Sequence, residues 1–167
     1  MDKKILAAAV ASLFAAPIRM ILAQPPNAKD GENRLRATFF AQNLTHEQLA
    51  SFETRFRCPL VQWYGMTETI APPVANPLLR RRDNMTIGLP VGAPLRVVDR
   101  DGVDVGSGGT GELLVGGQPG LTLMAGYLND QAATDAAIRD GWLHTGDVVT
   151  ITPTGMLAFH DRSKDMI

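Results

Sequence analysis

The sequence predicts an α/β fold, in which a partial parallel β-α-β layer is followed by an antiparallel, distorted β-barrel region. Residues 35–64 show strand, helix and strand patterns within about 30 residues, which is the length of a β-α-β unit with parallel neighbouring strands. After residue 76, short apolar runs alternate with glycines, which is typical of antiparallel barrels. We therefore expect domains at 1–78 and 79–160, followed by a separate segment at 161–167.

The first layer begins with an apolar run at residues 10–14, which we expect to be a short buried strand. Pro17 can open a helix that runs to about residue 23, because proline is tolerated in a first helical turn. A second strand is expected at 35–41. A second helix begins at Thr45, whose spacing from Gln48 matches a capping box. The apolar face of this helix has helical spacing and consists of Leu49, Phe52 and Phe56.

Pro59 ends the second helix, and residues 60–64 are again strand-like. Ligands in open α/β sheets bind beyond the carboxyl ends of the strands. The segment at 64–68 occupies that position, so the pattern alone makes it a candidate binding segment.

In the second region we expect four short strands, at 95–98, 112–115, 148–151 and 156–159. A helix at about 131–139 interrupts them and ends before Asp140 and Gly141. The glycine-rich stretch 106–111 lacks the lysine and the spacing of a phosphate-binding loop, so we expect a hairpin loop there.

Composition excludes several classes of function. The net charge of −1 provides no positive field for nucleic acid, and residues 80–82, three arginines, are expected to form a solvated loop. Cys58 is the only cysteine, which excludes an internal disulfide and a cysteine zinc cluster.

The N-terminal apolar run is too short for a membrane span and is broken by Pro17 and Arg19. Lys3 and Lys4 before residues 5–16 also fit a signal peptide, so a secreted β-rich binding module remains an alternative. The apolar pattern continues past Pro17, which favours a strand and a helix instead.

Two short segments combine glycine, hydroxyl, aromatic and carboxylate residues: Tyr-Gly-Met-Thr-Glu at 64–68 and Gly-Trp-Leu-His-Thr-Gly-Asp at 141–147. Such a set suits a nucleotide, with a ring for the base, a hydroxyl for phosphate, one carboxylate for Mg²⁺ and one for ribose. Each segment also has a purely structural explanation. Tyr64 could be a core residue at a strand end, and Asp147 could cap a turn before strand 148–151.

Together with the segment at 161–167, these segments resemble, in the same order, motifs of the adenylate-forming (AMP-binding) superfamily of acyl-CoA synthetases, luciferases and peptide-synthetase adenylation domains. The resemblance covers most of the chain and implies a piece of the large N-terminal domain of such an enzyme. Residues 41–45 and 118–120 resemble the carnitine or crotonobetaine CoA ligase branch.

The resemblance implies a role for each residue of the first segment. Tyr64 would stack on adenine, and Gly65 belongs to the same nucleotide-binding turn. Thr67 would contact the phosphate and Glu68 would hold Mg²⁺, and these two residues would be the catalytic ones.

The resemblance also implies roles in the later segments. Asp147 would accept hydrogen bonds from both ribose hydroxyls. Arg162 would reach the ribose or the phosphate, and Lys164 would be the hinge between the two domains of the family. Trp142, His144 and His160 are expected to be structural.

The implied function is an AMP-forming acid–thiol ligase, a cytoplasmic enzyme that uses ATP, Mg²⁺, CoA and a small-molecule carboxylic acid. The family's phosphate loop and C-terminal lysine have no counterpart among these 167 residues. We therefore expect an internal fragment that is inactive alone, for which a second chain could supply the missing segments. Two further alternatives are an adenylation domain that loads a carrier protein and a nucleotide-binding remnant without catalysis.

Overall fold

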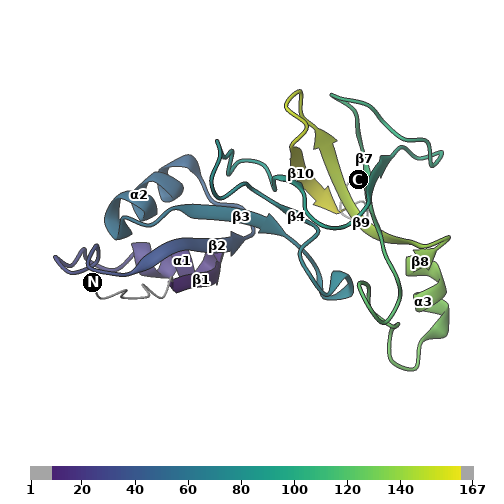
Figure 1. Cartoon of the computed structure of the whole chain (residues 1–167), viewed down its shortest axis with the longest axis horizontal. Helices are drawn as coiled ribbons and strands as arrows, with labels where there is room; N and C mark the ends of the chain where they lie inside the picture. The colour runs from purple at the N-terminus through teal and green to yellow at the C-terminus, as the bar shows by residue number, and fades with distance from the viewer. Residues whose placement is uncertain (1–8, 163–167) are drawn as a thin grey trace, which may run out of the picture. The chain divides into compact units, whose positions relative to one another are not determined.

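The computed structural model describes residues 9–162 and contains two compact units (Figure 1). The first unit comprises Met1–Gln62 and Pro77–Met85, and the second comprises Trp63–Asn76 and Thr86–Ile167. The domain boundaries expected after residues 78 and 160 remain predictions. Among the described residues, no helix has the length and apolar character that a membrane span requires.

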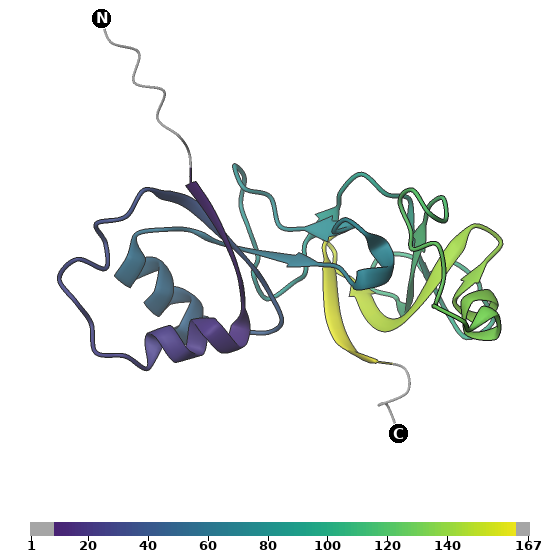
Figure 2. The same cartoon turned by 90° about the horizontal axis from the view of Figure 1, so that it is seen from below.

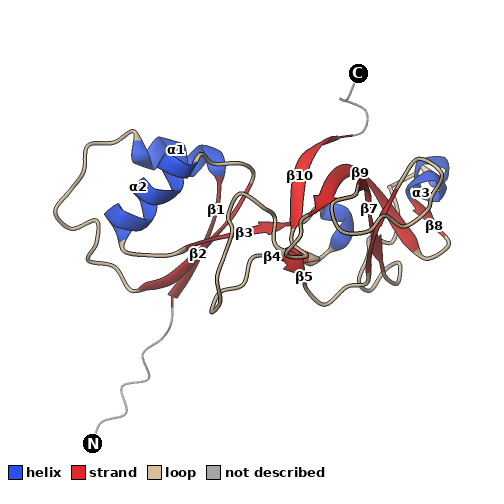
Figure 3. Ribbon diagram, turned by 90° about the horizontal axis from the view of Figure 1, so that it is seen from above, coloured by secondary structure: helices blue, strands red, loops and turns tan. Residues whose placement is uncertain are grey.

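The first unit contains the parallel β-layer that the sequence predicts, and helices cover one face of it. Its strands β1 (Ala9–Phe14), β2 (Leu35–Ala41) and β3 (Leu60–Tyr64) form parallel ladders, with Thr38 opposite Leu60. Helices α1 (Ala15–Leu22) and α2 (His46–Phe56) lie on the same side of these strands (Figure 3). The predicted bounds of β2 and β3 are confirmed, and β3 ends in Trp63 and Tyr64 of the second unit.

Helix α2 begins with the predicted capping box. Thr45 Oγ1 accepts a hydrogen bond from the Gln48 backbone N–H at 3.2 Å, and Gln48 Oε1 accepts one from the Thr45 N–H at 3.0 Å. The apolar face of α2 then packs on α1 and the strands. The buried core of this unit consists of Ala15, Ile18, Phe40, Leu44, Leu49, Phe52 and Leu60.

The expectation that the first strand is buried is wrong. In β1 the side chains of Val10 and Phe14 are 58% and 59% exposed. Only one face of β1 is covered by helices, and Leu13 on that face packs against the core. Within residues 9–162, β1 pairs with β2 alone, so its other edge has no strand beside it.

Arg55 of α2 connects the helix to the loop that follows α1. Its guanidinium donates to the backbone oxygens of Ile21, Gln24 and Pro25 at 2.8–3.1 Å. Its Nε donates to Asp30 Oδ2 at 2.6 Å, with both side chains largely buried. The Asn27 backbone N–H and the Arg55 guanidinium together hold the pKa of Asp30 below its ordinary value.

The second unit is a curled antiparallel sheet with strand order β10-β9-β7-β6, and β9 is strongly bent (Figure 2). Trp63 and Tyr64 at the end of β3 pair with β4, and β4 pairs with β5. Its core includes Val97, Leu113, Leu143 and Val149. The strands are β4 (Val74–Ala75), β5 (Leu89–Pro90), β6 (Leu95–Val98), β7 (Thr110–Gly116), β8 (Ile138–Arg139), β9 (Trp142–Ile151) and β10 (Leu157–Arg162).

Three expected boundaries in this unit are corrected. Helix α3 (Gln131–Ala137) ends two residues before the expected residue 139, because Ile138 and Arg139 form β8 and pair with β9. Strand β9 begins at Trp142, so most of the 141–147 segment lies within a strand. The final strand extends beyond the expected residue 159 and pairs with β9 as far as Asp147.

The contact between Asp30 and Arg55 predicts a pH-dependent stability. Because the pKa of Asp30 is lowered on folding, its contribution is present above the ordinary carboxyl pKa and is lost as pH falls through the lowered value. Asp30→Asn should lower the thermal unfolding midpoint near pH 7, and the difference from the parent should shrink below about pH 4. Glu32→Gln, an exposed carboxylate in the same loop, is the control. A difference that is constant with pH would contradict the assignment.

The uncovered edge of β1 predicts association of the isolated chain, because open strand edges pair with other chains. Light scattering over a concentration series should show oligomers. Val10→Lys should reduce them by placing a charge on the edge strand. Met20→Lys, at a residue of α1 that is 69% exposed, should have no such effect. A parent chain that is monomeric at every concentration would be the contrary result.

Candidate functional site

A hydrogen bond joins the two nucleotide-like segments of the sequence. Tyr64 is the last residue of β3, and its hydroxyl donates to Asp147 Oδ2 of β9 at 2.5 Å. Both side chains are buried, at 9% and 4% exposure. The Tyr64 ring lies 6.5 Å from that of Phe159 on β10. An aromatic ring and a carboxylate from distant segments are thus held in one buried pair.

The carboxylate of Asp147 is positioned by a bulge in β9. Residues 145–147 lie opposite Leu113 of β7, because the register shifts between the pairs Glu112–Val148 and Leu114–His144. Gly146 adopts a φ of 71°, which favours glycine. Bulges of this kind reorient side chains and are common beside active sites.

Hydrogen bonds fix every residue of this bulge. Thr145 Oγ1 donates to the Leu113 carbonyl at 2.7 Å and accepts from the Asp147 N–H at 3.0 Å. The Gly146 N–H donates to Glu112 Oε1 at 3.0 Å. Glu112 therefore holds the bulge, a structural role for which the sequence analysis gave no prediction.

Glu68 lies in a one-turn 3₁₀ helix, η1 (Thr67–Thr69), directly after β3. Its Oε1 accepts a hydrogen bond from the Tyr127 hydroxyl at 2.9 Å, and its backbone oxygen accepts one from the Met124 N–H at 2.8 Å. Gly65 allows the chain to turn closely here, since an added Cβ would lie 3.3 Å from Pro72 Cα.

A cavity of about 610 Å³ lies beside these residues. Its lining combines Glu68 with the bulge of β9 and one side of α3. The lining residues are Met66, Glu68, Glu112, Tyr127, Ala133, Ala136, Ala137, His144, Thr145 and Gly146. The lining therefore includes residues of both sequence segments, but not the buried Tyr64 and Asp147 themselves.

The side chains fit a magnesium ion only when a nucleotide completes its coordination. Across residues 9–162, no group of three or more His, Cys, Asp or Glu side chains is arranged to hold a metal. Mg²⁺ is commonly bound by one or two carboxylates together with substrate phosphates. Glu68, half-buried on the cavity wall, provides such a carboxylate.

The remaining predicted residues lie near this site to different extents. Thr67 is exposed in η1 beside Glu68. The backbone of Arg162 pairs with that of Asp147 in the β10–β9 ladder. Lys164 and the Arg162 side chain lie outside what the structure describes.

Sequence reasoning missed Tyr127 and Glu112, whose side chains hydrogen-bond to the predicted segments from elsewhere in the chain. In the sequence, the only feature that could have indicated Tyr127 as a site residue is an aromatic side chain directly after a glycine, Gly126. His144 and His160 have structural partners, Glu112 at 3.4 Å and Thr150 at 2.6 Å.

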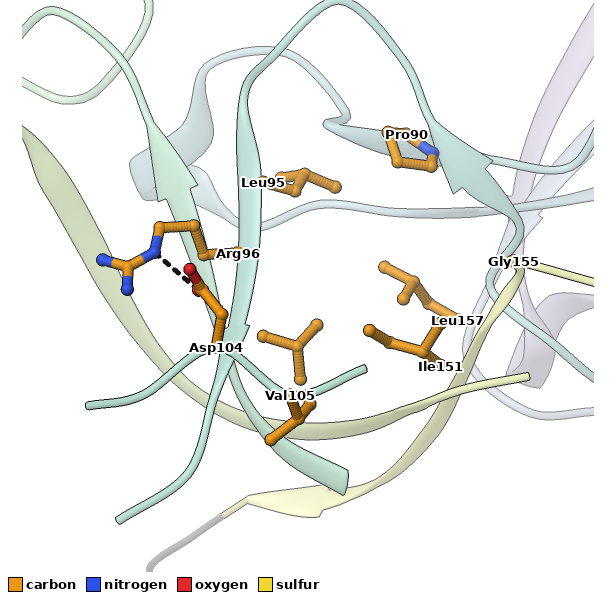
Figure 4. Close-up of a pocket in the computed structure, with 9 residues that line it drawn as sticks. Pro90, Leu95, Arg96, Asp104, Val105, Ile151, Gly155 and Leu157 are labelled. Carbon is orange, nitrogen blue, oxygen red and sulfur yellow. Dashed lines mark hydrogen bonds and ion pairs between the residues drawn. The ribbon is translucent and has the colours of Figure 1, made fainter. Parts of the chain in front are cut away.

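A separate cavity of about 270 Å³ lies in the second unit and contains none of the predicted site residues (Figure 4). Aliphatic side chains line it, among them Leu95, Val105 and Leu157. Arg96 Nε donates to Asp104 Oδ1 at 2.7 Å on its wall. The lining is therefore largely apolar, and its two charged side chains, Arg96 and Asp104, are paired with each other.

Solved structures share this fold. A benzoate CoA ligase from Burkholderia xenovorans LB400 superposes with a TM-score of 0.82 at 24% identity, over 95% of this chain and 32% of that one. The O-succinylbenzoate coenzyme A synthetase from Bacillus subtilis, solved with ATP and magnesium ion, gives 0.76 at 24% identity over the same shares. The predicted fold class is confirmed.

Sequence comparisons agree with the structural ones. The crotonobetaine/carnitine–CoA ligase of Proteus mirabilis is 37% identical over 152 residues, or 90% of this chain and 29% of that protein. Its namesake in Escherichia coli is also 37% identical, over 153 residues. The chain thus spans about 29% of the length of these relatives. A model of the AMP-binding enzyme family matches residues 6–128, and the chain therefore belongs to that family.

Proposed function

We propose that this chain forms the adenosine- and Mg²⁺-binding part of an AMP-forming acid–thiol ligase. The observation that carries the proposal is the hydrogen bond between Tyr64 and Asp147. This bond joins the hydroxyl of an aromatic residue, which would stack on the base, to a buried carboxylate, which would bind the ribose. The family match and the curated relatives, which are CoA ligases, support the same assignment.

Asp147 is suited to bind ribose hydroxyls. A carboxylate has about four acceptor positions, so it can accept the bond from Tyr64 and further bonds from a ligand. Its burial strengthens such bonds, because water competes little at this position. Arg162 is proposed to contact the ribose or the phosphate, because its backbone pairs with that of Asp147. Lys164, two residues further along the chain, is proposed to be the hinge between the two domains of the family.

Thr67 and Glu68 are proposed to act on the phosphates. The Thr67 hydroxyl would donate to a phosphate oxygen, while Glu68 would hold the Mg²⁺ that neutralises phosphate charge. Gly65 permits the tight turn that places both residues beyond the end of β3. These residues would contribute orientation and charge stabilisation.

In the whole enzyme, the proposed reaction has two steps. A carboxylate oxygen attacks the α-phosphate of ATP, so that an acyl-adenylate forms and pyrophosphate leaves. A thiol then attacks the acyl carbon, the thioester forms, and AMP leaves with the thiol proton released to solvent. The names of the curated relatives favour CoA as the thiol and a small carboxylic acid as the substrate.

Equilibrium binding of AMP to the 167-residue chain tests the ribose contact. Asp147→Ala should weaken binding about 10- to 100-fold, because hydrogen bonds to a charged group contribute about 1.5–3 kcal/mol. Tyr64→Phe should retain the stacking ring and lose less affinity than Asp147→Ala. Isothermal titration calorimetry measures both, with Asp101→Ala in an exposed turn as the control. Equal affinity of Asp147→Ala and parent would remove Asp147 from the site.

The metal contact has its own test. Glu68→Gln should abolish the gain in ATP affinity that Mg²⁺ gives the parent, because the neutral amide is a poor ligand for a hard cation. AMP affinity without metal should stay unchanged. Glu47→Gln, an exposed carboxylate on α2, should behave as the parent. An undiminished Mg²⁺ effect in Glu68→Gln would place the ion elsewhere.

A further inference from the structure

We infer that Tyr127 is a positioning residue that orients the Glu68 carboxylate for Mg²⁺, an inference that rests on the proposed function of Glu68. The Tyr127 hydroxyl donates to Glu68 Oε1 at 2.9 Å across 59 positions of sequence. The nearby Met124 N–H donates to the Glu68 backbone oxygen at 2.8 Å. One short segment therefore fixes both the backbone and the side chain of the proposed metal ligand.

Tyr127 is itself held by the start of α3. Its backbone N–H donates to Thr134 Oγ1 at 2.9 Å, and that hydroxyl donates to the Asp130 carbonyl at 2.9 Å. Asp130 caps α3 through a bond from the Ala133 N–H to its Oδ1 at 2.9 Å. The Tyr127 phenol is thus carried by a loop whose bonds to Thr134 and Asp130 do not involve the Glu68 side chain.

The exposure of Tyr127 argues against a packing role for its hydroxyl. The residue is 41% exposed and lies on the wall of the cavity that also contains Glu68. Removing only its oxygen leaves the backbone contacts of Tyr127 and the Met124–Glu68 bond in place. The variant Tyr127→Phe should therefore fold as the parent does.

The contact has a chemical consequence for the ion. A donor on Oε1 fixes the rotamer of Glu68 and leaves Oε2 to bind Mg²⁺. Groups that hydrogen-bond to a metal-ligating carboxylate typically change metal affinity by about 10- to 100-fold. Tyr64 and Asp147 make separate contacts, so affinity for the nucleoside should not depend on the Tyr127 hydroxyl.

The experiment measures binding of ATP to the full chain by calorimetry, with saturating Mg²⁺ and with chelator. The gain in ATP affinity on adding Mg²⁺ should fall about tenfold or more in Tyr127→Phe. AMP affinity in chelator and the thermal unfolding midpoint should match the parent. Leu128→Ala is the matched control, because this neighbouring side chain is 91% exposed and lines no part of the cavity.

A double-mutant cycle separates positioning from a general structural effect. If Tyr127 acts through Glu68, Tyr127→Phe should have no further effect in the Glu68→Gln background. A full Mg²⁺ gain in Tyr127→Phe, additive effects in the double variant, or an equal loss of metal-free AMP binding would each overturn the inference alone. A parent chain that binds neither AMP nor ATP would instead overturn the proposed function, and the inference with it.

Discussion

A buried carboxylate requires compensation, and in the second unit the hydrogen bond from Tyr64 to Asp147 provides part of it. Asp147 is 4% exposed at a strand position that alternation would otherwise give to an apolar residue. Both the end of β3 and the bulge of β9 must be in place for this bond to form. The bond can therefore form only when the strands of the curled sheet pair in the observed register.

The three carboxylates around the site differ in their surroundings, and the proposed function gives them different tasks. Asp147 is buried beside an aromatic ring, which suits neutral hydroxyl donors. Glu112 accepts from the Gly146 backbone N–H and so maintains the bulge. Glu68 is half-buried on a cavity wall with one oxygen held by Tyr127, which would suit the proposed binding of Mg²⁺ together with phosphates. Burial and hydrogen bonding, rather than residue type, distinguish these roles.

The first unit shows how a polar side chain can replace missing apolar contacts. The loop after α1 has few buried residues, so apolar packing alone stabilises its conformation only weakly. From a single guanidinium, Arg55 donates to the loop carbonyls of Gln24 and Pro25 and to the carboxylate of Asp30. It also donates to the Ile21 carbonyl in the last turn of α1. Its planar group with several donors makes this possible, which a lysine could not reproduce.

The sequence by itself determined the β-α-β layer, the capping box at Thr45 and the order of the nucleotide-like segments, because local periodicity and spacing encode these features. It also indicated Tyr64 and Asp147 as candidate site residues, through the resemblance of their segments to family motifs. It could not indicate that they share a hydrogen bond, that β9 begins at Trp142, or that Tyr127 contacts Glu68. Those facts depend on register shifts between strands and on contacts 59 or 83 positions apart. Only the tertiary structure decides such contacts, because no local pattern specifies which distant residue lies opposite a bulge.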